Sequence, residues 1–256
     1  LCKPLREISK VYGTGKMKDK ESVKRAGILG GMGPMATCYF FNRIITHTDA
    51  ARDQEHIDIC ILNHATIPDR TSAILTGEAE AFLKEAKEDC RKLADMGAEY
   101  IAIPCNTTHY FYDALAEASP IPILHMVRET IKEVITKYPD VQKVGIMATD
   151  GTVHANVYGR ECAAYGIQAV YPAPLMQTAV MHIIYNEIKK GKVGSLDIFS
   201  QVADSLREQG CQVMILACTE LSILKDEYPL PDDIVDAMDV LVRRFVEMSG
   251  RPYKEL

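Results

Sequence analysis

Two cysteines of this chain are placed where they could act on one substrate. Cys105 follows the apolar run 100–104, and Cys218 follows the apolar run 213–217. Short apolar runs of this kind are typical of buried strands in a parallel sheet. Because ligands of open α/β sheets bind at the carboxyl ends of the strands, we expect both thiols to border a binding cleft.

Two thiols on opposite sides of one carbon suit the inversion of a stereocentre. One thiolate removes the α-proton and the other thiol delivers a proton to the far face, which requires neither a metal nor an organic cofactor. Fixed donors must stabilise the charge that develops on the substrate carboxylate. The side chains that follow the cysteines, Asn106, Thr107, Thr108 and Thr219, are suitable donors. Backbone N–H groups at the starts of the following helices are expected to lower the pKa of a thiol there.

The composition excludes several classes of function. The 256 residues carry a formal net charge of −6, which gives no basic surface for nucleic acid or an anionic membrane. No apolar run approaches the ~20 residues of a membrane span, and the first six residues lack the apolar region of a signal peptide. We therefore expect a cytoplasmic protein. The eight cysteines form neither CxxC pairs nor Cys/His clusters at zinc spacing, so free thiols and no metal are expected.

After a polar extension over residues 1–22, strand-like runs alternate with segments of helical period, the pattern of βα units on a parallel sheet. The predicted strands are 24–30, 56–62, 100–104, 121–124, 143–148, 167–171, 213–217 and 234–236. The predicted helices are 34–48, 77–96, 110–118, 127–137, 152–165, 177–190, 196–209 and 239–248.

The two halves of this pattern are similar. Residues 27–30 (GILG) match residues 145–148 (GIMA), and each match is followed at a nearly equal distance by one of the two cysteines. We therefore predict an α/β fold of two similar lobes, each a parallel four-stranded sheet flanked by helices, related by a pseudo-twofold axis. The predicted lobes span 23–124 and 125–237, and the helix within 238–256 is a candidate addition to the first.

Three motifs together resemble the aspartate/glutamate racemase family. They are residues 27–37 (GILGGMGPMAT), 104–109 (PCNTTH) and 217–220 (ACTE), and the resemblance extends over about residues 24–248. It implies a cofactor-independent, homodimeric racemase whose active site lies between two α/β lobes. It also implies that the two cysteines are the acid/base pair, a role that falls on Cys105 and Cys218.

Finer features favour the aspartate racemase branch. Glutamate racemases typically have an Asp-Ser-Gly turn after the first strand and a histidine after the second Cys-Thr. This chain has GGMGP at 30–34 and Glu220 at those places. We therefore predict interconversion of L- and D-aspartate, with glutamate or a broader range of amino acids as the alternative.

The resemblance also implies residues that bind the substrate. Residues 67–71 (IPDRT) are similar to a segment of aspartate racemases whose arginine binds a substrate carboxylate, and a guanidinium suits that task, so Arg70 is the predicted clamp. Lys189 matches a lysine that the second lobe contributes, although Lys190 stands beside it. Thr149 occupies the place of a substrate-binding threonine in relatives.

The segment 31–36 also fits the GxGxxA fingerprint of dinucleotide-binding proteins. Pro34 removes a phosphate-binding N–H from that turn, and Asn63 and His64 follow the second strand where an acidic ribose ligand is expected. We therefore interpret the glycines as allowing the backbone to approach a small substrate, with Met32 lining the pocket. Glu220 is expected to contact a thiol or the substrate amine.

Two further alternatives belong to other classes. His109 and His125 follow Cys105, and a Cys-His pair is typical of nucleophilic catalysis. That interpretation leaves Cys218 without a role, so we expect His109 to shape the pocket. Two α/β lobes could also bind a small ligand without catalysing any reaction.

Overall fold

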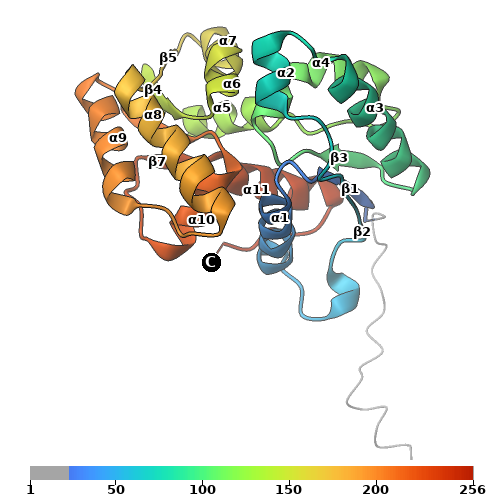
Figure 1. Ribbon diagram of the computed structural model, residues 1–256. Helices are drawn as coiled ribbons and strands as arrows, with labels where there is room; N and C mark the ends of the chain where they lie inside the picture. The colour runs from blue at the N-terminus through green and yellow to red at the C-terminus, as the bar shows by residue number, and fades with distance from the viewer. Residues whose placement is uncertain (1–22, 256) are drawn as a thin grey trace, which may run out of the picture.

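The computed structural model describes residues 23–255, so the predicted extension over residues 1–22 lies outside the described residues. Two parallel sheets lie side by side with helices around them (Figure 1). The first sheet has the order β2-β1-β3, with β1 (Ala26–Gly30), β2 (Ile59–Asn63) and β3 (Tyr100–Ala102). The second has the order β5-β4-β6-β7, with β4 (Lys143–Met147), β5 (Gln168–Val170), β6 (Val213–Leu216) and β7 (Ile234–Asp236).

Helices connect these strands. Those of the first half are α1 (Pro34–His47), the 3₁₀ turn η2 (Asp53–Glu55), α2 (Arg70–Thr76), α3 (Glu80–Asp95), the 3₁₀ turn η3 (Thr107–Phe111), α4 (Tyr112–Ala118) and α5 (Met126–Lys137). Those of the second half are α6 (Asp150–His154), α7 (Val157–Ala164), α8 (Pro174–His182), the π-helical η4 (Ile183–Glu187), the 3₁₀ turn η5 (Ile188–Lys190), α9 (Leu196–Glu208), α10 (Thr219–Glu227) and α11 (Ala237–Ser249).

The predicted α/β fold with two parallel sheets is confirmed, but the first sheet has three strands where four were predicted. The segment 121–124 pairs with β3 only through a single bridge between Ile101 and Ile123. Pro122 lies in this segment, and proline has no N–H to donate to a strand ladder. The bridge occupies the place that β7 has in the second sheet, so the strand order repeats in both halves.

Two predicted helices are interrupted. The segment 152–165 divides into α6 and α7 at Asn156, whose left-handed backbone (φ 50°) ends the first helical turn. The segment 177–190 is a succession of α8, η4 and η5. The short helix α2 was not predicted, although Asp69 caps its start by accepting a hydrogen bond from the Ser72 N–H, and Gly77 ends it.

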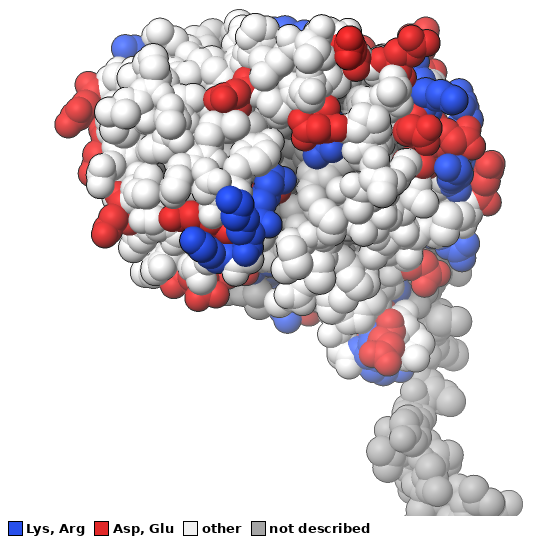
Figure 2. Space-filling model, viewed as in Figure 1, with Lys and Arg blue, Asp and Glu red and all other residues white. Residues whose placement is uncertain are grey.

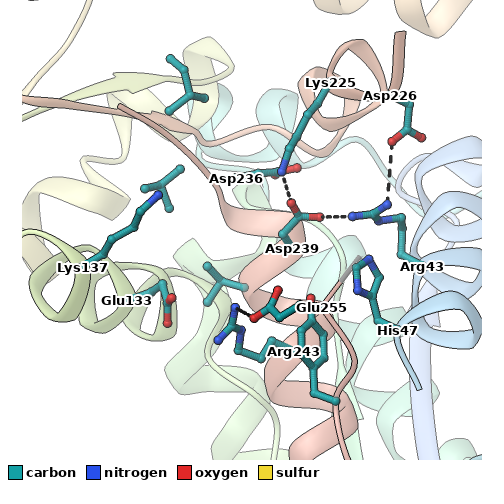
Figure 3. A pocket seen from close by; sticks show the side chains of 14 residues that line it. Arg43, His47, Glu133, Lys137, Lys225, Asp226, Asp236, Asp239, Arg243 and Glu255 are labelled. Carbon is teal, nitrogen blue, oxygen red and sulfur yellow. Dashed lines mark hydrogen bonds and ion pairs between the residues drawn. The ribbon is translucent and has the colours of Figure 1, made fainter. Parts of the chain in front are cut away.

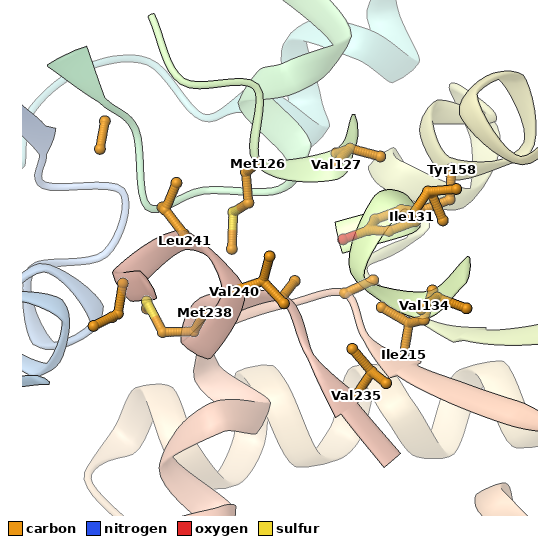
Figure 4. Packing of buried hydrophobic residues seen from close by; sticks show 14 of the residues in the cluster. Met126, Val127, Ile131, Val134, Tyr158, Ile215, Val235, Met238, Val240 and Leu241 are labelled. Atoms are coloured by element: carbon orange, nitrogen blue, oxygen red, sulfur yellow. The ribbon is translucent and has the colours of Figure 1, made fainter. Parts of the chain in front are cut away.

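The last helix, α11, packs against both α1 and α5 and contributes to a core that includes residues of both sheets (Figure 4). Its fully buried Phe245 lies edge-on to Phe40 of α1, with ring centroids 5.4 Å apart, and 5.2 Å from the ring of Tyr100. The Tyr100 hydroxyl donates a 2.6 Å hydrogen bond to the Phe245 carbonyl. One aromatic side chain of α11 thus joins the first sheet to its helices.

The surface carries charged side chains of both signs. On the face in Figure 2 most of the surface is uncharged, one small group of lysine and arginine side chains lies left of centre, and acidic and basic side chains are mixed at the upper right. Of the helices within residues 23–255, none is both long and apolar enough to cross a membrane.

Replacing Phe245 with alanine should destabilise the protein by about 3–5 kcal/mol, because it removes a buried ring from a packed aromatic cluster. Urea unfolding followed by circular dichroism measures the change. Leu175→Ala is the control, since Leu175 is 75% exposed and its truncation should alter the free energy of unfolding by less than about 0.5 kcal/mol. Equal effects of the two substitutions would contradict this account of the core.

Candidate active site

Both cysteines lie at the carboxyl ends of strands and face one cavity. Cys105 comes shortly after β3, and Cys218 lies between β6 and α10. The cavity has a volume of about 20 Å³, the space of roughly one water molecule. Its walls come from both halves of the chain: Met32, Asp69, Arg70, Thr71, Cys105, Asn106, Thr107, Thr149, Tyr185, Lys189, Cys218, Thr219 and Glu220.

All the predicted site residues except Thr108 line this cavity. Thr108 is fully buried, and its hydroxyl donates a 3.4 Å hydrogen bond to the sulfur of Met32. It therefore supports a cavity residue from behind, where direct contact with the substrate was predicted.

Three cavity residues were not predicted. Asp69 and Thr71 flank Arg70 at the start of α2, and the capping aspartate with a glycine eight residues later is the signal that could have revealed this helix. Tyr185 lies in the π-helical turn η4. Because a π turn departs from the period of an α-helix, the sequence pattern gave no indication that Tyr185 faces the cavity.

The 3₁₀ turn η5 directs the two neighbouring lysines to different sides. Lys189 points to the cavity, where its ammonium forms an ion pair with Glu220. Lys190 binds the side chain of Asn186 at 3.0 Å on the exposed side of the helix. Partial burial lowers the pKa of Lys189, but Glu220 and the two cysteines raise it by more. The pKa of Lys189 is therefore above its ordinary value.

Burial and the Glu220 carboxylate raise the pKa of the Cys218 thiol. The Cys218 thiol donates a 2.9 Å hydrogen bond to Oε2 of Glu220, whose other oxygen pairs with Lys189. Burial raises the pKa of Cys218 well above its ordinary value, the adjacent carboxylate raises it further, and Lys189 offsets only part of the rise. The expectation that the helix start lowers the thiol pKa is therefore wrong for Cys218, because desolvation and the Glu220 charge outweigh the backbone N–H groups.

Two buried donors in the cavity wall have no acceptor among the described residues. One is Nδ2 of Asn106, whose Oδ1 accepts a 2.6 Å hydrogen bond from Tyr158. The other is Nε of Arg70, whose Nη atoms donate to the carbonyls of Pro68 (3.2 Å) and Met32 (3.4 Å). Since buried polar groups are nearly always hydrogen-bonded, both N–H groups have the capacity to bind an acceptor atom.

Three threonine hydroxyls connect the two halves beside the cysteines. Thr107 lies 3.0 Å from Thr149 and 2.9 Å from Thr152, measured between hydroxyl oxygens. Thr149 also caps α6 by accepting a hydrogen bond from the Thr152 N–H. Thr149 is thus at the cavity, as predicted, while Thr152 anchors it from behind.

The geometry does not support a nucleophilic Cys-His pair. His109 approaches the backbone carbonyl of Cys105 through Nδ1, at 2.9 Å, and Nε2 accepts a 3.0 Å hydrogen bond from the Met126 N–H. Burial lowers the pKa of His109, so the ring is neutral and both nitrogens are engaged with the backbone. The histidine shapes the loop that carries Cys105, as expected.

The glycine-rich turn serves two purposes. Gly31 has a φ of 93°, and a Cβ built on it would lie 2.3 Å from the backbone of His64. Its role is close packing of two loops, where approach to the substrate was predicted. Gly33 faces Glu220 and Lys189. A Cβ built on Gly33 would lie 3.6 Å from Oε1 of Glu220 and 3.7 Å from Nζ of Lys189. Met32 therefore lines the cavity, and Gly33 lies beside two of its charged residues.

The seven cysteines within residues 23–255 are free thiols, and Cys2 lies outside the described residues. The same part of the chain holds no group of three or more His, Cys, Asp or Glu side chains arranged to bind a metal ion.

Known proteins share this architecture. Aspartate racemase of Picrophilus torridus is 26% identical, with a TM-score of 0.73 over 90% of this chain and 96% of that one. An aspartate racemase homologue from Pyrococcus horikoshii has a TM-score of 0.71 at 21% identity, over 89% and 99% of the two chains. The two-lobed α/β arrangement is thus a racemase fold.

The sequence comparisons give the same class. A broad specificity amino-acid racemase of Bacillus subtilis is 27% identical over 224 residues, which are 86% of this chain and 96% of that protein. The model of the Asp/Glu/Hydantoin racemase family matches residues 29–245. The chain belongs to this family, which places it among the isomerases.

Removing the negative charge of Glu220 and removing the positive charge of Lys189 should shift the pH at which Cys218 is alkylated in opposite directions. Glu220→Gln removes a charge that raises the thiol pKa, so Cys218 should react with iodoacetamide at lower pH than in the wild type. Lys189→Met removes a charge that lowers it, so the reaction should require higher pH. Peptide mass spectrometry across a pH series measures alkylation, with exposed Cys38 as internal reference. Shifts in the same direction would refute the assignment.

Proposed function

We propose that the protein interconverts L- and D-aspartate by proton transfer between two cysteines and the α-carbon, without a cofactor. One observation carries the proposal: Cys105 and Cys218 line a single cavity whose wall also holds donors of Asn106 and Arg70 that have no acceptor within residues 23–255. Acid and base groups supply both protons, and the free donors supply the stabilisation that a developing enediolate requires.

In the proposed reaction, a thiolate at Cys105 takes the α-proton as the carbon–hydrogen bond breaks. The electron pair moves into the carboxylate, which becomes an enediolate held by Asn106 and the neighbouring hydroxyls. The Cys218 thiol then gives its proton to the opposite face of the carbon. The hydrogen bond from Cys218 to Glu220 supports its role as the acid in this direction. The opposite enantiomer uses the same steps with the two cysteines exchanged.

The other cavity residues have roles in binding. Arg70 binds the side-chain carboxylate of the substrate, and Glu220 and Lys189 bind its ammonium and α-carboxylate groups. Met32, Thr107, Thr149 and Thr219 complete the wall. The resemblance to an aspartate racemase supports aspartate as the substrate.

Glutamate or a broader range of amino acids is the alternative substrate class, which the likeness to a broad specificity racemase supports. One methylene group is worth only ~1–3 kcal/mol of discrimination. A protein that binds amino acids without catalysing a reaction is the more distant alternative. A homodimer, as the family resemblance implies, stays a prediction that sedimentation velocity can check.

Racemisation in D₂O should place deuterium on the α-carbon of aspartate, because an exchangeable thiol delivers the new proton. Cys105→Ser and Cys218→Ser should each lower kcat by about 10²–10⁴-fold, since an alcohol is a poor acid and base at neutral pH. Nuclear magnetic resonance measures deuterium, and circular dichroism measures inversion. Cys38→Ser, at an exposed cysteine, is the control. Absence of α-deuterium with aspartate, glutamate and other amino acids would sink the proposal and favour a binding protein.

Arg70→Gln should reduce kcat/KM for aspartate about tenfold to a hundredfold, the effect of losing a charged hydrogen bond of ~1.5–3 kcal/mol. Turnover of alanine, which has no side-chain carboxylate, should change little. Arg70→Lys should recover only part of the loss, because an ammonium cannot bind a carboxylate through two parallel N–H groups. Arg91→Gln on the surface is the control. An equal loss with both substrates would show that Arg70 does not read the side chain.

A further inference from the structure

The open groove between α1, α10 and α11 is crossed by ion pairs of its own side chains (Figure 3). Asp239 binds Arg43 at 3.1 Å and also pairs with Lys225. This groove shares no wall residue with the cysteine cavity. A polar group without a partner within residues 23–255 lies instead directly after Cys105, at Nδ2 of Asn106.

The two residues that follow Cys105 are held by the other half of the chain. Oδ1 of Asn106 accepts a 2.6 Å hydrogen bond from the hydroxyl of Tyr158 on α7. The hydroxyl of Thr107 contacts two threonine hydroxyls at the start of α6. The proposed reaction uses Asn106 and the threonines but gives Tyr158 no role.

Tyr158 lies behind the cavity wall and not in it. Its ring is fully buried and packs into the core beside Ile131 of α5 (Figure 4). Burial raises the pKa of Tyr158 well above its ordinary value, so the hydroxyl keeps its proton at neutral pH. Tyr158 therefore acts as a donor, and any effect of this donor on a bound substrate has to pass through Asn106.

The hydrogen bond from Tyr158 sets which end of the Asn106 amide is free. The two ends of a carboxamide have nearly the same shape, and a rotation by half a turn exchanges an acceptor for a donor. A distance of 2.6 Å is ordinary for O–H···O and short for N–H···O, so the oxygen is the end that meets Tyr158. Nδ2 is then left over as a donor, in a side chain that lines the cavity.

The interruption between α6 and α7 places Tyr158 within reach of Asn106. Asn156 has a φ of 50°, and among the non-glycine residues of 23–255 it alone has a positive φ. Its Oδ1 accepts a 2.9 Å hydrogen bond from the hydroxyl of Tyr171, whose oxygen accepts a 3.2 Å hydrogen bond from the Gly159 N–H. A Cβ built on Gly159 would lie 1.9 Å from Oδ1 of Asn156, so the turn requires glycine there. Uncommon backbone conformations that are held in this way cluster at functional sites.

We propose that Tyr158 is a positioning residue for racemisation, which keeps the Nδ2 donor of Asn106 turned toward the α-carboxylate of the substrate. This inference rests on the proposed function, in which Asn106 stabilises the enediolate. Negative charge on the carboxylate oxygens grows as the α-proton leaves. A donor that is oriented beforehand therefore stabilises the transition state more than the bound substrate, and its loss lowers kcat more than it raises KM.

Tyr158→Phe tests the role, because it removes the hydroxyl and keeps the ring. We expect kcat for aspartate to fall about tenfold or more, while KM changes by less than about threefold. In an Asn106→Ala background, adding Tyr158→Phe should change kcat by less than about twofold, because the group through which Tyr158 acts is gone.

Tyr100→Phe is the matched control for a loss of stability. Tyr100 is also fully buried and also donates a 2.6 Å hydrogen bond, to the carbonyl of Phe245, and neither residue lines the cysteine cavity. Both variants lose one buried hydrogen bond, so thermal melts should show similar decreases in stability. Only Tyr158→Phe should lower kcat.

The side-chain NH₂ signal of Asn106 gives a test that needs no turnover. Nuclear magnetic resonance of protein labelled with ¹⁵N-asparagine detects this signal, and its loss in Asn106→Ala assigns it. Succinate, a dicarboxylate without a stereocentre, should shift the signal in the wild type and in Tyr100→Phe, and much less in Tyr158→Phe. If no amino acid is racemised, the proposed function fails, and the succinate shift still decides whether Tyr158 orients the amide.

Three results would overturn the inference. One is an equal loss of kcat in Tyr158→Phe and Tyr100→Phe, which would show a general effect of stability. Another is a kcat effect of Tyr158→Phe that is as large in the Asn106→Ala background as in the wild type. The third is an Asn106 signal that succinate leaves unchanged in the wild type or shifts equally in Tyr158→Phe.

Discussion

The buried carboxylate of Glu220 constrains the whole site. A charge that is 5% exposed must be paired and hydrogen-bonded to persist, and Glu220 obtains these partners from separate elements. Lys189 comes from η5, and the thiol of Cys218 precedes α10. The carboxylate therefore holds the 3₁₀ turn η5 against α10. Without it, Lys189 would lose its ion-pair partner and the Cys218 thiol would lose its hydrogen-bond acceptor.

The repeated strand order does not make the two thiols equivalent. Cys105 is followed by an amide and a hydroxyl in a 3₁₀ turn, and its carbonyl is held by a neutral histidine. Cys218 is followed by a hydroxyl and a carboxylate at the start of an α-helix. The two halves share their backbone plan, but only one places a negative charge beside its cysteine. The surroundings of the two thiols thus differ in charge because of one position, Glu220.

The sequence was sufficient for the sheets and for the positions of both cysteines, because apolar runs and helical periods are local signals. It was insufficient where the local signal conflicted with the tertiary structure. Pro122 reduced a predicted strand to one bridge, and Asn156 divided a predicted helix. The π turn brought Tyr185 to the cavity against the α-helical period, and Thr108 faces inward although the three residues before it line the wall. Contacts between residues far apart in the chain decided these cases.

The small volume of the cysteine cavity has a consequence for affinity measurements. Room for about one water molecule does not admit an amino acid, so the walls of this cavity must move apart before a substrate binds. The apparent affinity is the intrinsic affinity reduced by the free energy of that movement. The hydroxyl contacts of Thr107 with Thr149 and Thr152 join the two halves beside the cavity. A movement that separates the halves breaks these contacts, and their free energy is then subtracted from the affinity for substrate.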